Sequence, residues 1–75
     1  MKPGDLVNVT IVVVRELPKA LLFYEPDEGV TARTALKQWI PKSLVSGQIP
    51  LAGSGHRGVV QMPFWKAEEL GLMWS

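Results

Sequence analysis

The chain has 75 residues and a formal net charge of +1, with 47% hydrophobic and 20% charged residues. This length and composition are typical of one small globular domain spanning residues 1–75. The absence of cysteine excludes a disulfide framework and a thiolate metal site, and no run of 18 apolar residues is present, so we expect a cytoplasmic protein without a membrane partner.

The first predicted element is a strand over residues 6–15. Apolar side chains occupy every second position from Val7 to Val13, as in a strand with one buried face. Five valines and one isoleucine in this stretch favour a strand over a helix. Residues 16–19 interrupt the pattern, and residues 20–24 (ALLFY) predict a second strand, antiparallel to the first.

The middle of the chain is less regular. Residues 25–29 combine proline, glycine and three acids, which predicts a loop, and residues 30–38 predict an irregular approach to a third strand over residues 36–40. In the motif WIPKS, Pro41 cannot donate to a strand ladder and biases the residue before it toward extended backbone. We therefore expect this strand to end at a sheet edge or a bend, with residues 42–45 starting again in a new direction.

The last third of the chain predicts a loop, a short strand and a helix. Residues 52–58 (AGSGHRG) are typical of a mobile hairpin tip, and residues 59–62 predict a strand. Pro63 is expected at the first helical position and Gly71 just past the helix end. A helix of about seven residues is unstable alone, so it must dock on the sheet. The two candidate docking faces are Phe64, Ala67 and Leu70, or Trp65 and Leu72.

This order of elements predicts the fold class. Several short strands, glycine-rich turns and one terminal helix indicate a mainly β, or small α+β, protein. Two forms fit: a small SH3-like or OB-like β-barrel, and a rolled antiparallel sheet, each with a short C-terminal helix. Both forms reduce the exposure of strand edges, which is a particular problem in so small a sheet.

The charges are distributed unevenly along the chain. Residues 1–28 carry three bases and five acids, residues 67–75 carry two acids, and residues 29–66 carry five bases and no acid. Aromatic residues are interspersed among these bases, and cations with flat rings suit the phosphates and unstacked bases of a single strand. We therefore predict a nucleic-acid-binding or partner-binding set consisting of Arg33, Lys37, Trp39, Lys42, Arg57, Trp65 and Lys66.

Structural roles compete with this interpretation, and catalysis is not expected. Aromatic side chains dominate small cores, which favours an interior position for Trp39. The lone His56 lies near Ser54 in a flexible glycine loop that cannot hold a catalytic triad, and it has no acid near it in sequence to complete a metal site. Glu68 and Glu69 point in different directions on a helix. We expect no enzymatic activity, no cofactor and no metal.

Two motifs resemble those of a group of small bacterial and phage proteins of uncharacterised activity. The first is WIPKS at residues 39–43, preceded by Lys19-Ala20. The second is a C-terminal segment matched here by Pro63, Trp65, Ala67, Glu68, Glu69, Gly71 and Leu72. The resemblance implies a setting of phage replication and recombination, and hence of nucleic acid, and it supplies no catalytic residue. The chain departs from that pattern by extra residues between Pro26 and Leu36.

Three functions from different classes fit these observations. The first is a non-enzymatic phage or prophage-type module that binds single-stranded nucleic acid. The second is a small protein inhibitor of a host nucleic-acid enzyme or defence system, in which the acidic residues 25–28 mimic phosphates or Phe64 and Trp65 anchor the partner. The third is a structural homodimer that buries Met73 and Trp74, since a second copy would add stability to so small a chain.

Overall fold

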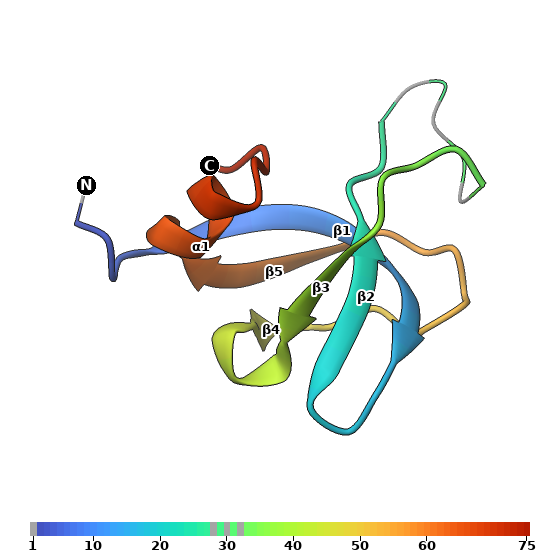
Figure 1. Cartoon of the computed structure of the whole chain (residues 1–75), viewed down its shortest axis with the longest axis horizontal. Helices are drawn as coiled ribbons and strands as arrows, with labels where there is room; N and C mark the ends of the chain where they lie inside the picture. The colour runs from blue at the N-terminus through green and yellow to red at the C-terminus, as the bar shows by residue number, and fades with distance from the viewer. Residues whose placement is uncertain (1, 28, 30, 32) are drawn as a thin grey trace.

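The computed structural model describes residues 2–27, 29, 31 and 33–75. It has five antiparallel strands in one sheet and a short C-terminal helix, which confirms the mainly β prediction (Figure 1). No helix in these described ranges is long and apolar enough to span a membrane. In chain order the elements are β1 (Leu6–Glu16), β2 (Ala20–Tyr24), β3 (Gln38–Pro41), the 3-10 helix η1 (Lys42–Leu44), β4 (Ser46–Gly47), β5 (Gly58–Pro63) and α1 (Phe64–Glu69).

The long strand β1 holds the sheet together, because its two halves pair with different partners. Residues 6–11 pair with β5, and residues 12–16 pair with β2. The register shifts between Val13 and Arg15, so that Val14 is an extra residue on β1. A bulge of this kind bends a strand and increases its twist. The two halves of the sheet therefore face different directions, as the bent path of β1 shows (Figure 1).

The sheet is rolled because its two edge strands are neighbours in sequence. The strand order is β3-β2-β1-β5-β4, and only residues 42–45 link β3 to β4. In a flat sheet the two edges would lie about 19 Å apart. A four-residue link that includes a 3-10 turn spans only about 13 Å. Of the two predicted forms, the rolled sheet is the one observed, since β3 and β4 do not pair with each other among the described residues.

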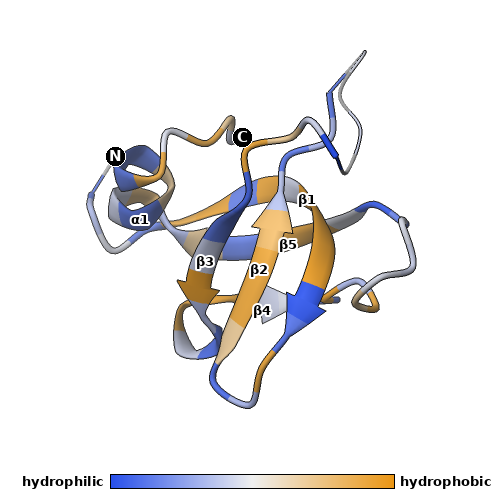
Figure 2. Cartoon of the chain, turned by 45° about the vertical axis from the view of Figure 1, so that its right-hand side comes forward, coloured by the Kyte–Doolittle hydropathy of each residue, from blue (hydrophilic) through white to orange (hydrophobic). Residues whose placement is uncertain are grey.

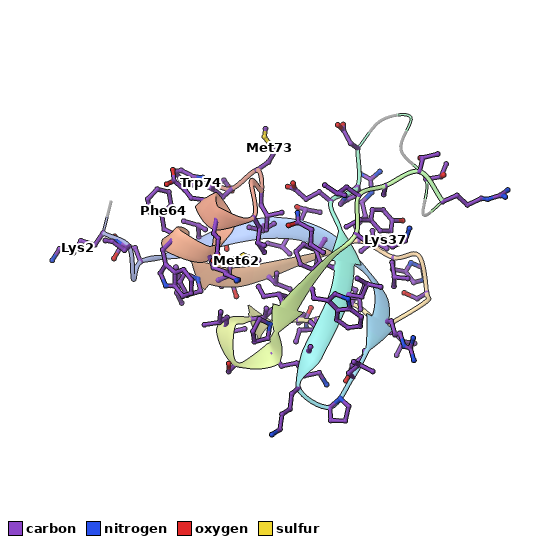
Figure 3. The ribbon with its side chains drawn as sticks, viewed as in Figure 1. Lys2, Lys37, Met62, Phe64, Met73 and Trp74 are labelled. Atoms are coloured by element: carbon purple, nitrogen blue, oxygen red, sulfur yellow. The ribbon has the colours of Figure 1, made fainter. Side chains whose placement is uncertain are left out.

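The concave side of the roll contains the hydrophobic core, which the helix α1 completes. The buried cluster consists of Val7, Val9, Ile11, Val13, Leu21, Phe23, Ile40, Val60, Met62, Ala67 and Leu72. Phe64 and Leu70 pack against this cluster, so the first of the two predicted docking faces is the one used. Leu72, from the other predicted face, is buried as well. Figure 3 shows Met62 beneath α1, where the helix meets β5.

The end of α1 follows the predicted stop signal. Gly71 has a φ of 71°, and its N–H donates to the Glu68 carbonyl at 3.1 Å. The Leu72 N–H donates to the Ala67 carbonyl at 2.9 Å. This pair of bonds is the Schellman motif, in which a left-handed glycine satisfies the last helical carbonyls. It also turns the chain so that Leu72 enters the core.

Some predicted boundaries need correction. β3 begins at residue 38 rather than 36. The predicted change of direction after Pro41 is made by η1, which turns the chain toward β4. Pro63 is the N-cap of α1 rather than its first residue, since it still pairs with Leu6 in the ladder of β5. The irregular segment before β3 is confirmed by the turn that Thr31 and Thr34 form. Within it, Glu28, Val30 and Ala32 lie outside the described residues.

A matched pair of glycine substitutions tests how closely the 48–50 segment packs on β5. A Cβ on Gly58 would overlap with Pro50 Cγ and lie 2.9 Å from its Cδ, whereas a Cβ on Gly4 would meet nothing within 4 Å. We expect Gly58→Ala to lower the free energy of unfolding by about 1–3 kcal/mol, as overpacking does, and Gly4→Ala to change it little. Urea unfolding would measure both variants, and equal stability would contradict this packing.

Candidate nucleic-acid interface

An outward-facing row of side chains crosses three strands at one end of the sheet. Arg15 on β1 pairs with Leu22 on β2, and Leu22 pairs with Trp39 on β3. Arg15 is exposed, Leu22 is half-buried, and 46% of Trp39 is exposed. Because neighbouring strands lie about 4.8 Å apart, the backbones of Arg15 and Trp39 are about 10 Å apart. The row therefore places an indole and a guanidinium on one surface, with an apolar side chain between them.

The exposure of Trp39 corrects the expectation that it packs inside. Successive side chains of a strand point to opposite faces, and Ile40 is the residue of β3 that fills the core. Gln38 donates from Nε2 to the Leu70 carbonyl at 3.0 Å, which ties β3 to the end of α1. With both neighbours held in this way, Trp39 faces away from the core on an edge strand.

Lys37 lies next to this row. It directly precedes β3 and is half-buried near the end of β2 (Figure 3). We call the surface formed by Arg15, Leu22, Lys37 and Trp39 the Trp39 face. The polar start of β3 and the apolar body of β2 lie side by side on it (Figure 2). Three of its four residues come from register pairs, so the ladder itself fixes their arrangement.

Lys42 takes part in an ion pair. Its ammonium contacts a carboxylate oxygen of Glu16, the last residue of β1. Its backbone N–H also donates to the Lys19 carbonyl, at 2.9 Å. Both side chains of the pair are partly exposed to solvent. The charge of Lys42 is therefore largely balanced by a neighbour of opposite sign.

Trp65 and Lys66 form a second, separate group on α1. The Lys66 ammonium lies 5.7 Å from the centroid of the Trp65 ring, which is cation–π geometry. The same ammonium contacts Glu69 at 3.1 Å. Trp65 is 44% exposed. The Trp65 ring of this group is exposed, but the Lys66 cation is paired with Glu69. A second acid, Glu68, lies on the same helix.

The remaining predicted bases lie on loops. Arg33 is exposed in the segment between β2 and β3, and Arg57 is exposed in the glycine-rich segment just before β5. The seven predicted residues thus occur on five segments of the chain: the 25–37 loop, β3, η1, the loop before β5, and α1. The structure brings Lys37 close to Trp39, and Lys66 close to Trp65.

Sequence reasoning missed Arg15. The period-two pattern that puts Val7 and Val13 inside the core would also put Arg15 inside, and the bulge at Val14 reverses this. The sequence did contain an indication of this. Alternation along the strand would place the charged side chain of Arg15 in the core, and a bulge before it avoids that. The acid-rich composition of residues 1–28 obscured it.

The chemistry of the Trp39 face is determined by the side chains that form it. Within the described ranges there is no group of three or more histidine, cysteine or acidic side chains that could hold a metal ion. The Trp39 face has a flat ring that can stack on a ligand, an apolar side chain beside it, and two cations that can bind an anion.

Removing the Glu16 charge tests whether its pair with Lys42 is structural. Partly exposed ion pairs contribute about 0–1 kcal/mol, so we expect Glu16→Gln to lower the free energy of unfolding by less than about 1 kcal/mol. The matched control is Glu68→Gln on the exposed side of α1. Urea unfolding of both variants is the measurement. A loss above about 2 kcal/mol in Glu16→Gln alone would show that the pair holds the rolled sheet together.

No protein-family model, curated protein or solved structure matches this chain. The resemblance of WIPKS and the C-terminal segment to small phage proteins therefore stays a prediction. A function for this protein is inferred from the geometry and charges of its own surfaces.

Proposed function

We propose that the protein is a non-enzymatic binding module of phage or prophage type, acting in the cytoplasm, that holds single-stranded nucleic acid on the Trp39 face. The observation that carries this proposal is the outward row of Arg15, Leu22 and Trp39. A base stacked on the indole would bring the adjoining sugar-phosphate backbone toward the Arg15 guanidinium. Aromatic stacking accepts any base, because every base has a flat π-face.

The position of β3 at the sheet edge supports this proposal. Among the described residues no strand lies beyond β3, so a ligand can approach the Trp39 ring from the open side. Leu22 provides an apolar surface beside the ring, and Lys37 adds a second positive charge. A single strand, whose bases are unpaired, can use all three features. A duplex presents only its grooves and phosphates.

The proposed contact is smaller than the full set of bases predicted from the sequence. Lys42 and Lys66 already contact carboxylates, and Arg33 and Arg57 belong to separate loops. The Trp39 face itself supplies two cations, Arg15 and Lys37. Binding through this face is therefore expected to depend on stacking more than on charge.

Variants of Trp39 separate its stacking role from its fluorescence signal. We expect Trp39→Ala to weaken binding of an oligothymidine of about 12 nucleotides by about 5- to 150-fold, because each stacked base contributes about 1–3 kcal/mol. Trp39→Phe keeps a ring, so it should retain most of the affinity while losing the quenching of tryptophan emission. Anisotropy of a labelled oligonucleotide and intrinsic fluorescence measure the two effects.

Matched controls come from the other two tryptophans. Trp65→Phe and Trp74→Phe should preserve the quenching, because both rings lie outside the Trp39 face. Equal affinity of Trp39→Ala and the unaltered protein would contradict the proposal. A loss of affinity in Trp65→Ala instead would move the interface to α1.

The salt dependence of binding measures how many bases contact phosphates. Two bases predict a slope of about −1.4 in a plot of log affinity against log salt, whereas all five predicted bases would give about −3.5. We expect Lys37→Gln to reduce the slope by about 0.7, and Lys19→Gln, in the turn after β1, to leave it unchanged. A slope near zero would contradict phosphate contact altogether.

A further inference from the structure

A groove lies between the C-terminal segment and the loop that follows β2. Its volume is about 700 Å³, which is within the usual range of ligand sites. Both segments lie at the same end of the molecule (Figures 1 and 2). The side chains and backbone that line it belong to Asn8, Thr10, Glu25, Pro26, Asp27, Thr34, Ala35, Leu36, Gln38, Leu70, Gly71, Met73, Trp74 and Ser75. None of these residues belongs to the Trp39 face.

The lining of this groove is acidic and apolar. Glu25 and Asp27 contribute two carboxylates, and no Lys, Arg or His is among the described residues that line it. Leu36 and Met73 are 81% and 82% exposed, so they add apolar surface beside the two carboxylates. Although the whole chain has a net charge of +1, the groove therefore carries negative charge beside apolar surface.

The walls of the groove are held in place by short contacts. The Met73 N–H donates to a Glu25 carboxylate oxygen at 2.8 Å, which joins the two walls. The rings of Phe64 and Trp74 meet edge to face, with centroids 5.0 Å apart (Figure 3). A carboxylate can accept several hydrogen bonds, so Glu25 can also contact a ligand cation.

On one edge of β1, Thr10 lies between two paired residues at the floor of the groove, since Asn8 pairs with Ser75 and Val12 pairs with Tyr24. Asn8 exchanges backbone hydrogen bonds with Ser75, at 2.8 and 3.0 Å, so its N–H and C=O point to this side of β1. In a strand these groups alternate between the two edges, so those of Thr10 point the same way. The ladder with β2 begins only at Val12. Among the described residues, no backbone group pairs with Thr10 on this edge.

We propose that this groove, here called the Thr10 groove, binds an extended segment of another protein that carries Lys or Arg beside apolar side chains. One backbone N–H and one C=O of this segment would pair with Thr10, in the space between Ser75 and Tyr24. Its cation would lie near Glu25 and Asp27, and its apolar side chains would cover Leu36 and Met73. The negative lining disfavours nucleic acid in this groove, so the site is distinct from the Trp39 face.

The test uses a fluorescein-labelled peptide of alternating valine and arginine, blocked at both ends, and the same peptide with glutamate in place of arginine. We expect the arginine peptide to bind at least about 10-fold more tightly by anisotropy, because like charges would meet in the second case. Leu36→Lys should weaken binding of the arginine peptide by about 10-fold or more, for the same reason. Met73→Lys is a second variant with the same expected effect.

Leu51→Lys is the matched control, because Leu51 is 76% exposed and lies outside the Thr10 groove. It should bind the arginine peptide as the unaltered protein does, and circular dichroism should show all three variants to be folded. Equal binding of Leu36→Lys and Leu51→Lys, or of the two peptides, would overturn the proposal.

A second copy of the chain is the remaining possible occupant. If Leu36→Lys abolishes a concentration-dependent increase in mass seen by sedimentation of the unaltered protein, the groove is a dimer interface and the proposal is wrong. A mass that stays monomeric in both proteins, together with selective binding of the arginine peptide, supports it. Because Trp39→Ala leaves the Thr10 groove intact, failure of oligonucleotide binding and failure of peptide binding are separate results.

Discussion

The short connection between the two edge strands is the constraint on which the rest of the structure depends. Because residues 42–45 must join β3 to β4, the sheet cannot lie flat and one of its faces becomes an interior. Ile40 fills that interior, so Trp39, its neighbour on the strand, must face outward. The same turn brings Lys42 to the end of β1, where it meets Glu16. The core, the exposed indole and the ion pair thus have one common cause.

This small protein has two surfaces of opposite charge, the Trp39 face and the Thr10 groove. The Trp39 face presents Arg15 and Lys37 around a ring, on the half of β1 that pairs with β2. The Thr10 groove presents carboxylates and apolar side chains on the other half, where β2 has left the ladder and Ser75 pairs with Asn8. The ladder with β2 covers only residues 12–16 of β1, and this leaves room for the groove beside the other half of the strand. If β2 paired with β1 along its whole length, Thr10 would have a backbone partner on that edge.

The strands and the helix could be predicted from local patterns, because alternation, proline and glycine act over a few residues. The strand β1, the stop at Gly71 and the edge position of Pro41 all follow from such signals. The arrangement of the site could not be predicted in the same way. Ion pairs such as that of Lys42 join residues far apart in sequence, and a run of bases does not reveal which of them are already paired. The choice between Trp39 and Ile40 for the core depended on the roll of the sheet, which is a property of the whole chain.

The bulge at Val14 has a consequence for how this protein could change over time. A bulge absorbs one extra residue, so the residues after it keep the faces that a regular ladder with one residue fewer would give them. Removing Val14 would leave Arg15 opposite Leu22 and facing outward, whereas a regular pairing of Val14 with Leu22 would turn Arg15 toward the interior. Among closely related chains, loss of this one residue would therefore leave the Trp39 face in place. A change that abolishes the bulge while keeping the length of β1 is the variation that would turn this surface inward.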